Sequence, residues 1–270
     1  MCTDNVTLRE GFDITHSAIW SGRRCSAKMK SIASSWCDVY GNKPMHDITT
    51  QDVLDFVRQR VANGDAPRTV SARLAALRSV SDFCICTVPQ LIEKPLPRVP
   101  APRVNPSPAW WLEPSKREEI RPKLPYTLAQ LVDIICETGL RVEEALRVRP
   151  EHVERRADGP WLRVPGTKTK GSAVCIPISI TAESLIASWG GIHGGYTKAM
   201  RMWRTSRVAL GLPEEATLRG LRRSFAATKH MQGMPTEMLR RIMRHTDIST
   251  TVGYLQLLGF DGVEGCRAYL

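Results

Sequence analysis

The sequence has no run of about eighteen apolar residues, the length that a membrane-spanning helix requires, and no N-terminal pattern of a secretory signal. Its eight cysteines are scattered without a Cys-x-x-Cys pair, and its six histidines do not cluster with them. A disulfide framework and a structural zinc site are therefore not expected. These absences predict a cytoplasmic protein with reduced thiols that requires no membrane, cofactor or metal ion.

Acidic residues are also scarcer than basic ones. Asp and Glu total 27 against 38 Lys and Arg, which gives a formal net charge of +11. This excess favours a polyanionic partner, with nucleic acid ahead of a membrane surface. The apolar share of 42% and the charged share of 24% are typical of a globular protein, and 270 residues suffice for two domains.

Prolines are concentrated in one stretch, "EKPLPRVPAPRVNPSP" at 93–108. Proline disfavours both helix interiors and central strands, so an extended, semi-rigid connector is expected there. We therefore predict an N-terminal domain over 1–92, a linker over 93–110 and a C-terminal domain over 111–270.

The N-terminal part has helical patterning throughout. "SAKMKSIASSWCDVYG" ends at Gly41, and "DITTQDVLDFVRQRVANG" begins at a threonine cap. A third helix, "APRTVSARLAALRSVSDFCI", has a regular apolar face, and its other face carries Arg68, Arg73 and Arg78. These arginines are candidate contacts to DNA phosphates, and solvation of a surface helix is the alternative.

The C-terminal part is predicted to be mainly α with a small antiparallel β-sheet. A strong amphipathic helix over 127–139 stops at Gly139, and helical patterning resumes with "LRVEEALRV". Two apolar strands at 161–164 and 173–178 flank a turn rich in Gly and Lys. Further helices are expected at 181–189, 196–209, 217–232, 235–244 and 249–258.

Four motifs follow one another in this part. They are "TGLRVEE" with Arg141, "TKT" with Lys168, "RGLR" with Arg222, and "RHTDISTTVGY" with His245 and Tyr254. In this order they resemble the motifs of tyrosine recombinases of the phage integrase family. Residues 43–77 also resemble that family's helical core-binding domain, and the likeness covers about residues 20–258. The resemblance implies a DNA-binding domain over 1–92 and an α+β catalytic domain over 111–270.

The resemblance also implies an activity. Such a site-specific recombinase or integrase, encoded by a phage or mobile element, cuts and rejoins duplex DNA through a 3′-phosphotyrosyl intermediate and a Holliday junction, without metal or ATP. Its expected partners are double-stranded DNA and an accessory DNA-bending or directionality protein. Four copies of the chain are expected to assemble as a homo-tetramer on synapsed DNA. The free chain is expected to be a monomer or weak oligomer. A type I topoisomerase-like relaxase and a non-catalytic DNA-binding relative are the alternatives.

Each motif residue has an implied role in this chemistry. Arg141 and Arg222 would clamp the phosphate through fork geometry, and Tyr254 would attack it. Lys168 would protonate the leaving oxygen, although Lys170 in the same turn competes for this role. His245 would hydrogen-bond the phosphate or assist proton transfer.

Three other residues of these motifs also have a bearing on the site. Glu144 is expected to hold neighbouring basic groups in place. Arg219 stands where the family usually has His, and an arginine can donate to phosphate but cannot take a proton. Arg244 stands where the family usually has Gly. Proton removal from Tyr254 is therefore left to His245 or to solvent, unless the chain is an inactive relative.

Overall fold

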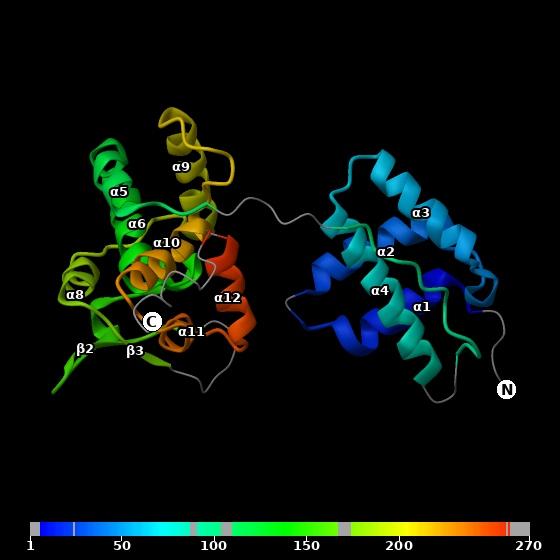
Figure 1. The fold of residues 1–270 in the computed structure, drawn as a ribbon. Coiled ribbons are helices and arrows are strands. Elements are labelled where there is room, and N and C mark those ends of the chain that lie inside the picture. The colour runs from blue at the N-terminus through cyan, green and yellow to red at the C-terminus, as the bar shows by residue number, and fades with distance from the viewer. Residues whose placement is uncertain are drawn as a thin grey trace, which may run out of the picture. The chain divides into compact units, whose positions relative to one another are not determined.

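A computed structural model of the chain describes residues 6–23, 25–86, 91–103, 110–166, 174–257 and 259, although not the side chains of Tyr254 and Leu257. The chain forms two compact units, Met1–Pro106 and Ser107–Leu270 (Figure 1). The boundary between these units falls inside the proline-rich stretch. No helix among the described residues is long and apolar enough to cross a membrane.

The N-terminal unit is helical. In chain order its elements are α1 (Leu8–Thr15), the π-helical turn η1 (His16–Trp20), α2 (Ser26–Tyr40), the 3-10 turn η2 (Met45–Asp47), α3 (Thr50–Ala62) and α4 (Pro67–Cys86). Its core contains Trp36 of α2 stacked on Phe56 of α3, with ring centroids 3.5 Å apart. The threonine cap expected before α3 is confirmed: the Thr49 hydroxyl accepts from the Asp52 N–H, and the Asp52 carboxylate accepts from the Thr49 N–H.

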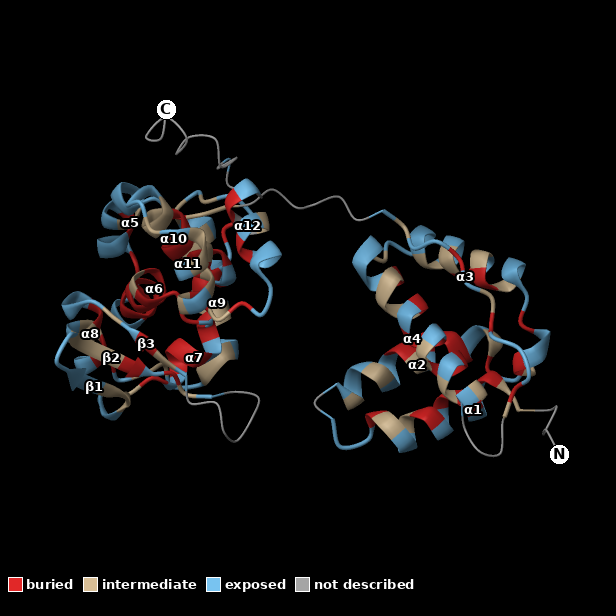
Figure 2. Cartoon of the chain, turned by 60° about the horizontal axis from the view of Figure 1, so that its bottom comes forward, coloured by how far each residue is buried: buried red, intermediate tan, exposed pale blue. Residues whose placement is uncertain are grey.

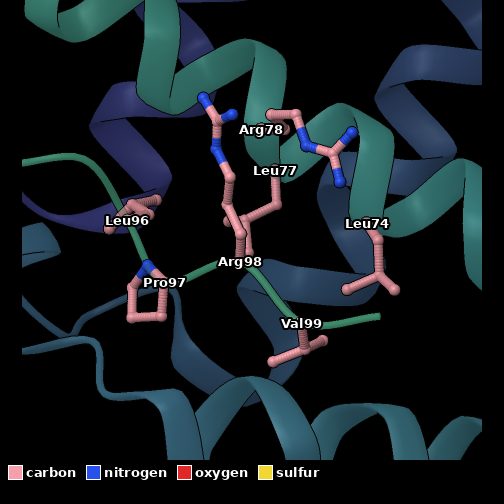
Figure 3. Close-up of a pocket in the computed structure, with 7 residues that line it drawn as sticks. All are labelled: Leu74, Leu77, Arg78, Leu96, Pro97, Arg98 and Val99. Carbon is pink, nitrogen blue, oxygen red and sulfur yellow. The ribbon is translucent and has the colours of Figure 1, made fainter. Parts of the chain in front are cut away.

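The first part of the expected linker is packed rather than free. Leu96 and Val99 are buried in the N-terminal core, and the Leu96 N–H donates to the Ser81 hydroxyl at 2.8 Å. Together with Leu74 and Leu77 of α4 they line a small hollow at the surface (Figure 3). The prolines do prevent helix and strand here, but the apolar side chains of Leu96 and Val99 still dock on α4. The first part of the predicted connector, up to Val99, therefore packs on the N-terminal unit.

The C-terminal unit surrounds a central helix. Its helical elements are α5 (Pro114–Ile120), η3 (Arg121–Lys123), α6 (Tyr126–Thr138), α7 (Val142–Arg147), η4 (Pro150–His152), α8 (Ile180–Ala187), α9 (Gly195–Ala209), α10 (Leu218–Met231), α11 (Thr236–Met243) and α12 (Ile248–Leu257). Buried residues occur along most of α6, which packs against α8 and α10 (Figure 2). This burial on nearly all sides explains why the α6 sequence is apolar beyond a single stripe.

A three-stranded antiparallel sheet lies at the edge of this unit, in the order β1 (Val153–Arg156), β2 (Gly159–Arg163), β3 (Cys175–Pro177). Leu162 of β2 is buried, and it pairs with Val153 on one side and Ile176 on the other. The predicted fold class, mainly α with a small antiparallel sheet, is confirmed. The sequence predicted only two strands and missed β1. The turn between β2 and β3, with Lys168 and Lys170, lies outside the described residues.

Candidate active site

The site begins where α6 ends. Gly139 has left-handed backbone with φ of 64°, and a Cβ atom there would lie 2.6 Å from the Phe225 ring of α10. Only glycine meets both conditions, because other residues strain in this conformation and would strike the ring. Leu140 is then buried, and Arg141 becomes the N-cap of α7. The tight turn therefore fixes where Arg141 begins the next helix.

Arg141 is held by a carboxylate one turn further along α7. The Arg141 N–H donates to Glu144 Oε2 at 2.8 Å, and its guanidinium Nη1 donates to Glu144 Oε1 at 3.0 Å. The Glu144 side chain is only 5% exposed, whereas that of Arg141 is 51% exposed. Glu144 thus holds the Arg141 side chain in place, while the half-exposed guanidinium can still contact a ligand.

Arg222 approaches the same carboxylate from α10. The apolar side of α10, with Leu218 and Leu221, is buried against α6, and this packing carries Arg222 into the interior. Its guanidinium donates to the Met243 carbonyl, and its Nη1 lies 4.0 Å from Glu144 Oε2. Arg222 therefore joins α7, α10 and the end of α11.

A third arginine completes the group around Glu144. Arg244 caps the C-terminal end of α11 in the left-handed conformation, with φ of 55°. Its Nη2 donates to Glu144 Oε2. Three guanidinium groups from Arg141, Arg222 and Arg244 therefore surround one buried carboxylate, which leaves a local excess of two positive charges. Such an excess in a partly desolvated place favours a bound anion.

His245 follows directly and is buried. Its Nδ1 lies 2.8 Å from the Thr251 hydroxyl of α12, and its carbonyl accepts from Arg240 Nη1 at 2.9 Å. Burial, and then the positive charges of Arg222, Arg141, Arg244 and Arg240, lower the pKa of His245 to about 4. The imidazole is therefore neutral at neutral pH and can donate or accept a hydrogen bond through its other nitrogen.

The His245–Thr251 contact connects the arginine group to α12. Thr251 is fully buried in the first half of that helix, and Tyr254 follows three residues later in the same helix. The side chain of Tyr254 is outside the described part of the structure. The backbone arrangement therefore brings the helix of Tyr254 to the residue that borders the arginines.

The structure brings some predicted site residues together and separates others. Arg141, Glu144, Arg222 and His245 converge from three segments, whereas Arg219 is exposed on the first turn of α10. Lys168 and its competitor Lys170 lie outside the described residues. Thr251 had no predicted role, and Arg244 was identified from the sequence only as a departure from the family pattern. The Thr250–Thr251 pair between His245 and Tyr254 was the sequence signal that could have identified Thr251.

The three arginines predicted to contact DNA from α4 have unequal surroundings. A spacing of five residues turns a helix by 500°, so successive members point about 140° apart and do not share one face. Arg68 and Arg78 are exposed. The Arg73 side chain is only 12% exposed, and its Nε lies 3.1 Å from Asp65 Oδ2. The same oxygen forms an ion pair with Arg60 Nε at 2.8 Å. Arg73 thus closes the loop between α3 and α4.

Across the described residues, no group of three or more His, Cys, Asp or Glu side chains is placed to hold a metal ion. The groups that do converge are guanidinium donors, a neutral imidazole and a hydroxyl. Their arrangement suits binding of a phosphodiester, whose oxygens accept hydrogen bonds and gain charge during displacement.

Known proteins of one family resemble the chain in sequence and in fold. It is 28% identical over 213 residues to tyrosine recombinase XerC of Erythrobacter litoralis, covering 70% of this chain and 68% of that protein. It is 25% identical over 265 residues to tyrosine recombinase XerC of Bradyrhizobium diazoefficiens, covering 86% and 81%. A lambda integrase tetramer bound to a Holliday junction has the same fold, with a TM-score of 0.73 and 17% identity over 94% of this chain and 78% of that chain. No protein-family profile matches the chain.

The family resemblance drawn from four short motifs is thus supported by relatives that span both units and by the fold. In sequence the chain is similar to tyrosine recombinases, and in fold it is similar to lambda integrase.

Proposed function

We propose that this protein is a site-specific DNA recombinase, an integrase of a phage or other mobile element, that cuts and rejoins duplex DNA. The observation that carries the proposal is the convergence on Glu144 of Arg141, Arg222 and Arg244, beside a neutral histidine. Such a group suits the scissile phosphate of DNA. It lies next to the helix that carries Tyr254, the proposed nucleophile.

The proposed reaction is a transesterification at phosphorus. The Tyr254 oxygen forms a bond to the phosphorus, the bond from phosphorus to the 5′-oxygen breaks, and a 3′-phosphotyrosyl ester results. Arg141 and Arg222 would stabilise the charge on the phosphate oxygens, and Arg219 would add a donor from the exposed side. The leaving oxygen takes a proton from Lys168 or Lys170. Rejoining reverses these steps, so the ester conserves the bond energy and no ATP is needed.

The proton of Tyr254 requires an acceptor. The guanidinium of Arg219 has no acceptor atom and cannot serve, while His245 is neutral because its pKa is lowered to about 4. The Thr251 hydroxyl can donate to His245 Nδ1 or accept from it, so the second ring nitrogen can act as donor or acceptor. His245 would therefore either hydrogen-bond the phosphate or assist proton transfer.

The remaining partners follow from charge and family. A net charge of +11 suits duplex DNA, with the 1–92 domain contacting DNA through Arg68 and Arg78 and the 111–270 domain performing the chemistry. The lambda integrase relative assembles as a tetramer on a Holliday junction, and we propose the same assembly for this chain, free as a monomer or weak oligomer. We also propose that it acts with an accessory DNA-bending or directionality protein and that it binds DNA in the cytoplasm.

The test uses two DNA substrates. A nicked duplex traps the covalent intermediate, and a pair of recombination sites on one plasmid reports strand exchange. Wild-type protein is expected to form the adduct and exchange strands, Tyr254→Phe to bind DNA but do neither, and Tyr126→Phe, which changes an exposed tyrosine of α6, to match wild type. Plasmid relaxation without exchange would favour the topoisomerase-like alternative. DNA binding without any adduct would identify a non-catalytic relative.

A further inference from the structure

Arg244 has an unusual backbone for its residue type. Among the residues that the structure describes, it is the one non-glycine residue in the left-handed region, with φ of 55° and ψ of 45°. This conformation costs free energy for any residue with a Cβ atom, and helices usually end this way at glycine. The same chain does use glycine at the left-handed end of α6, at Gly139. Something at the end of α11 therefore outweighs the strain of an arginine.

The Arg244 side chain carries a second cost. It is only 11% exposed, and its Nη1 is buried without a hydrogen-bond partner among the described residues. Burying a guanidinium and leaving a donor unused both disfavour the folded state. A residue with two such costs is expected only where it makes an interaction that a smaller one cannot. That interaction is the bond from its Nη2 to Glu144 Oε2.

This one ion pair joins segments that are far apart in sequence. On one side, Glu144 fixes both the backbone N–H and the guanidinium of Arg141. On the other, Arg244 precedes His245, which contacts Thr251 in the helix of Tyr254. Arg244 and Glu144 thus link the element that carries the first phosphate-binding arginine to the elements that carry the histidine and the nucleophile.

We propose that Arg244 is a positioning residue that ties the turn between α11 and α12 to α7, thereby setting His245 and α12 relative to Arg141. This inference rests on the proposed function for its effect on catalysis. The arginine acts through Glu144 and His245. Replacement by glycine removes the backbone strain and the tie together, whereas lysine keeps the charge and the strain but offers one ammonium in place of a planar fork.

The experiment compares Arg244→Gly and Arg244→Lys with wild type in the full-length chain. The matched control is Arg241→Lys, which changes a 75% exposed arginine of the same helix. Three quantities are measured for each protein: the affinity for a nicked duplex, the single-turnover rate of covalent cleavage at saturating protein, and the titration of His245 by NMR. The first separates binding from positioning, and the third does not depend on activity.

For Arg244→Gly we expect nearly unchanged affinity and a cleavage rate lower by at least about tenfold, because misplaced catalytic groups lose rate steeply. The pKa of His245 should rise, since one nearby positive charge and part of the burial are lost. Arg244→Lys should lie between glycine and wild type in both measurements, and Arg241→Lys should match wild type. If the glycine variant does not fold, the lysine variant carries the test by the same two readouts.

Wild-type cleavage by Arg244→Gly with an unchanged His245 titration would overturn the proposal. So would a cleavage defect explained by lost affinity, because Arg244 would then act in DNA binding. If the wild-type protein itself forms no adduct, the proposed recombinase function fails instead. The His245 titration in Arg244→Lys, which keeps the positive charge, then still tests whether Arg244 holds the turn between α11 and α12.

Discussion

Glu144→Gln is expected to destabilise the free protein and to make its C-terminal unit more dependent on bound phosphate. The substitution keeps the size of the side chain but removes the one negative charge among three guanidinium groups, Arg141, Arg222 and Arg244. A glutamine oxygen can still accept one or two of these hydrogen bonds. Its amide nitrogen cannot accept any of them, so at least one of these donors loses its partner.

The magnitude follows from burial. Breaking a buried ion pair by removing one partner costs about 3–5 kcal/mol. The lower end, about 3 kcal/mol, is expected here, because Arg141 is half exposed and can turn towards water. For a unit the size of Ser107–Leu270 this corresponds to a melting temperature lower by roughly 6–12 °C.

The assay is thermal unfolding of the full chain by calorimetry, with and without a target duplex. Glu143→Gln is the matched control, because Glu143 is the preceding residue and makes only an exposed pair with Arg147 at 3.1 Å. Its loss should cost roughly 0.5 kcal/mol or less. Bound DNA should restore more stability to Glu144→Gln than to Glu143→Gln, since the phosphate replaces part of the missing negative charge.

Equal melting temperatures for the two variants would refute the view that Glu144 balances the three arginines. A large loss for Glu144→Gln that DNA does not reduce would refute the idea that Arg141 and Arg222 face a phosphate.

Three further predictions follow from the site. Gly139→Ala should destabilise the protein by about 2–4 kcal/mol and reduce cleavage, because the added Cβ atom meets the Phe225 ring. Gly64→Ala, with open space around it, should show only the smaller conformational cost. Equal losses of unfolding free energy for the two variants in a denaturant titration would contradict this. The pKa of His245 is lowered to about 4, so between about pH 6.5 and 4 this imidazole binds a proton in the unfolded chain but not in the folded one. The free energy of unfolding should therefore decrease by up to about 3 kcal/mol as the pH is lowered through this window. The slope should be weaker in His245→Gln, and a slope unaffected by His245→Gln would count against a buried neutral imidazole. Strand cleavage should proceed in EDTA, and a strict requirement for magnesium in the cleavage step would contradict the proposed chemistry.

The longer helices could be read from the sequence because their apolar residues repeat with a helical period. α6, α9 and α10 lie within about two residues of their expected bounds. The missed elements are short. β1 reads "VERR" and is mostly exposed, so it has no alternation, and only its pairing with β2 makes it a strand. α1 did carry a signal, since Thr7 and Glu10 form a capping box.

The site was predictable in its parts but not in its connections. Motif spacing selected Arg141, Arg222 and His245 as candidates, and the proximity of Glu144 to Arg141 followed from one helical turn. The contact between Glu144 and Arg244 spans one hundred residues and depends on how α11 packs beside α10. No periodicity reports such a contact. For Lys168 and the Tyr254 side chain, which the structure does not describe, the assignments stay predictions.

The measurement that tests the central claim most directly is the identification of the residue that carries the DNA. A nicked duplex is incubated with the full-length protein, the trapped adduct is digested with protease and nuclease, and the modified peptide is sequenced by mass spectrometry. The account predicts a 3′-linked nucleotide on Tyr254 in the peptide from α12, and none on Tyr40, Tyr126, Tyr196 or Tyr269. A nucleotide on another residue, or an adduct that persists in Tyr254→Phe, would contradict it.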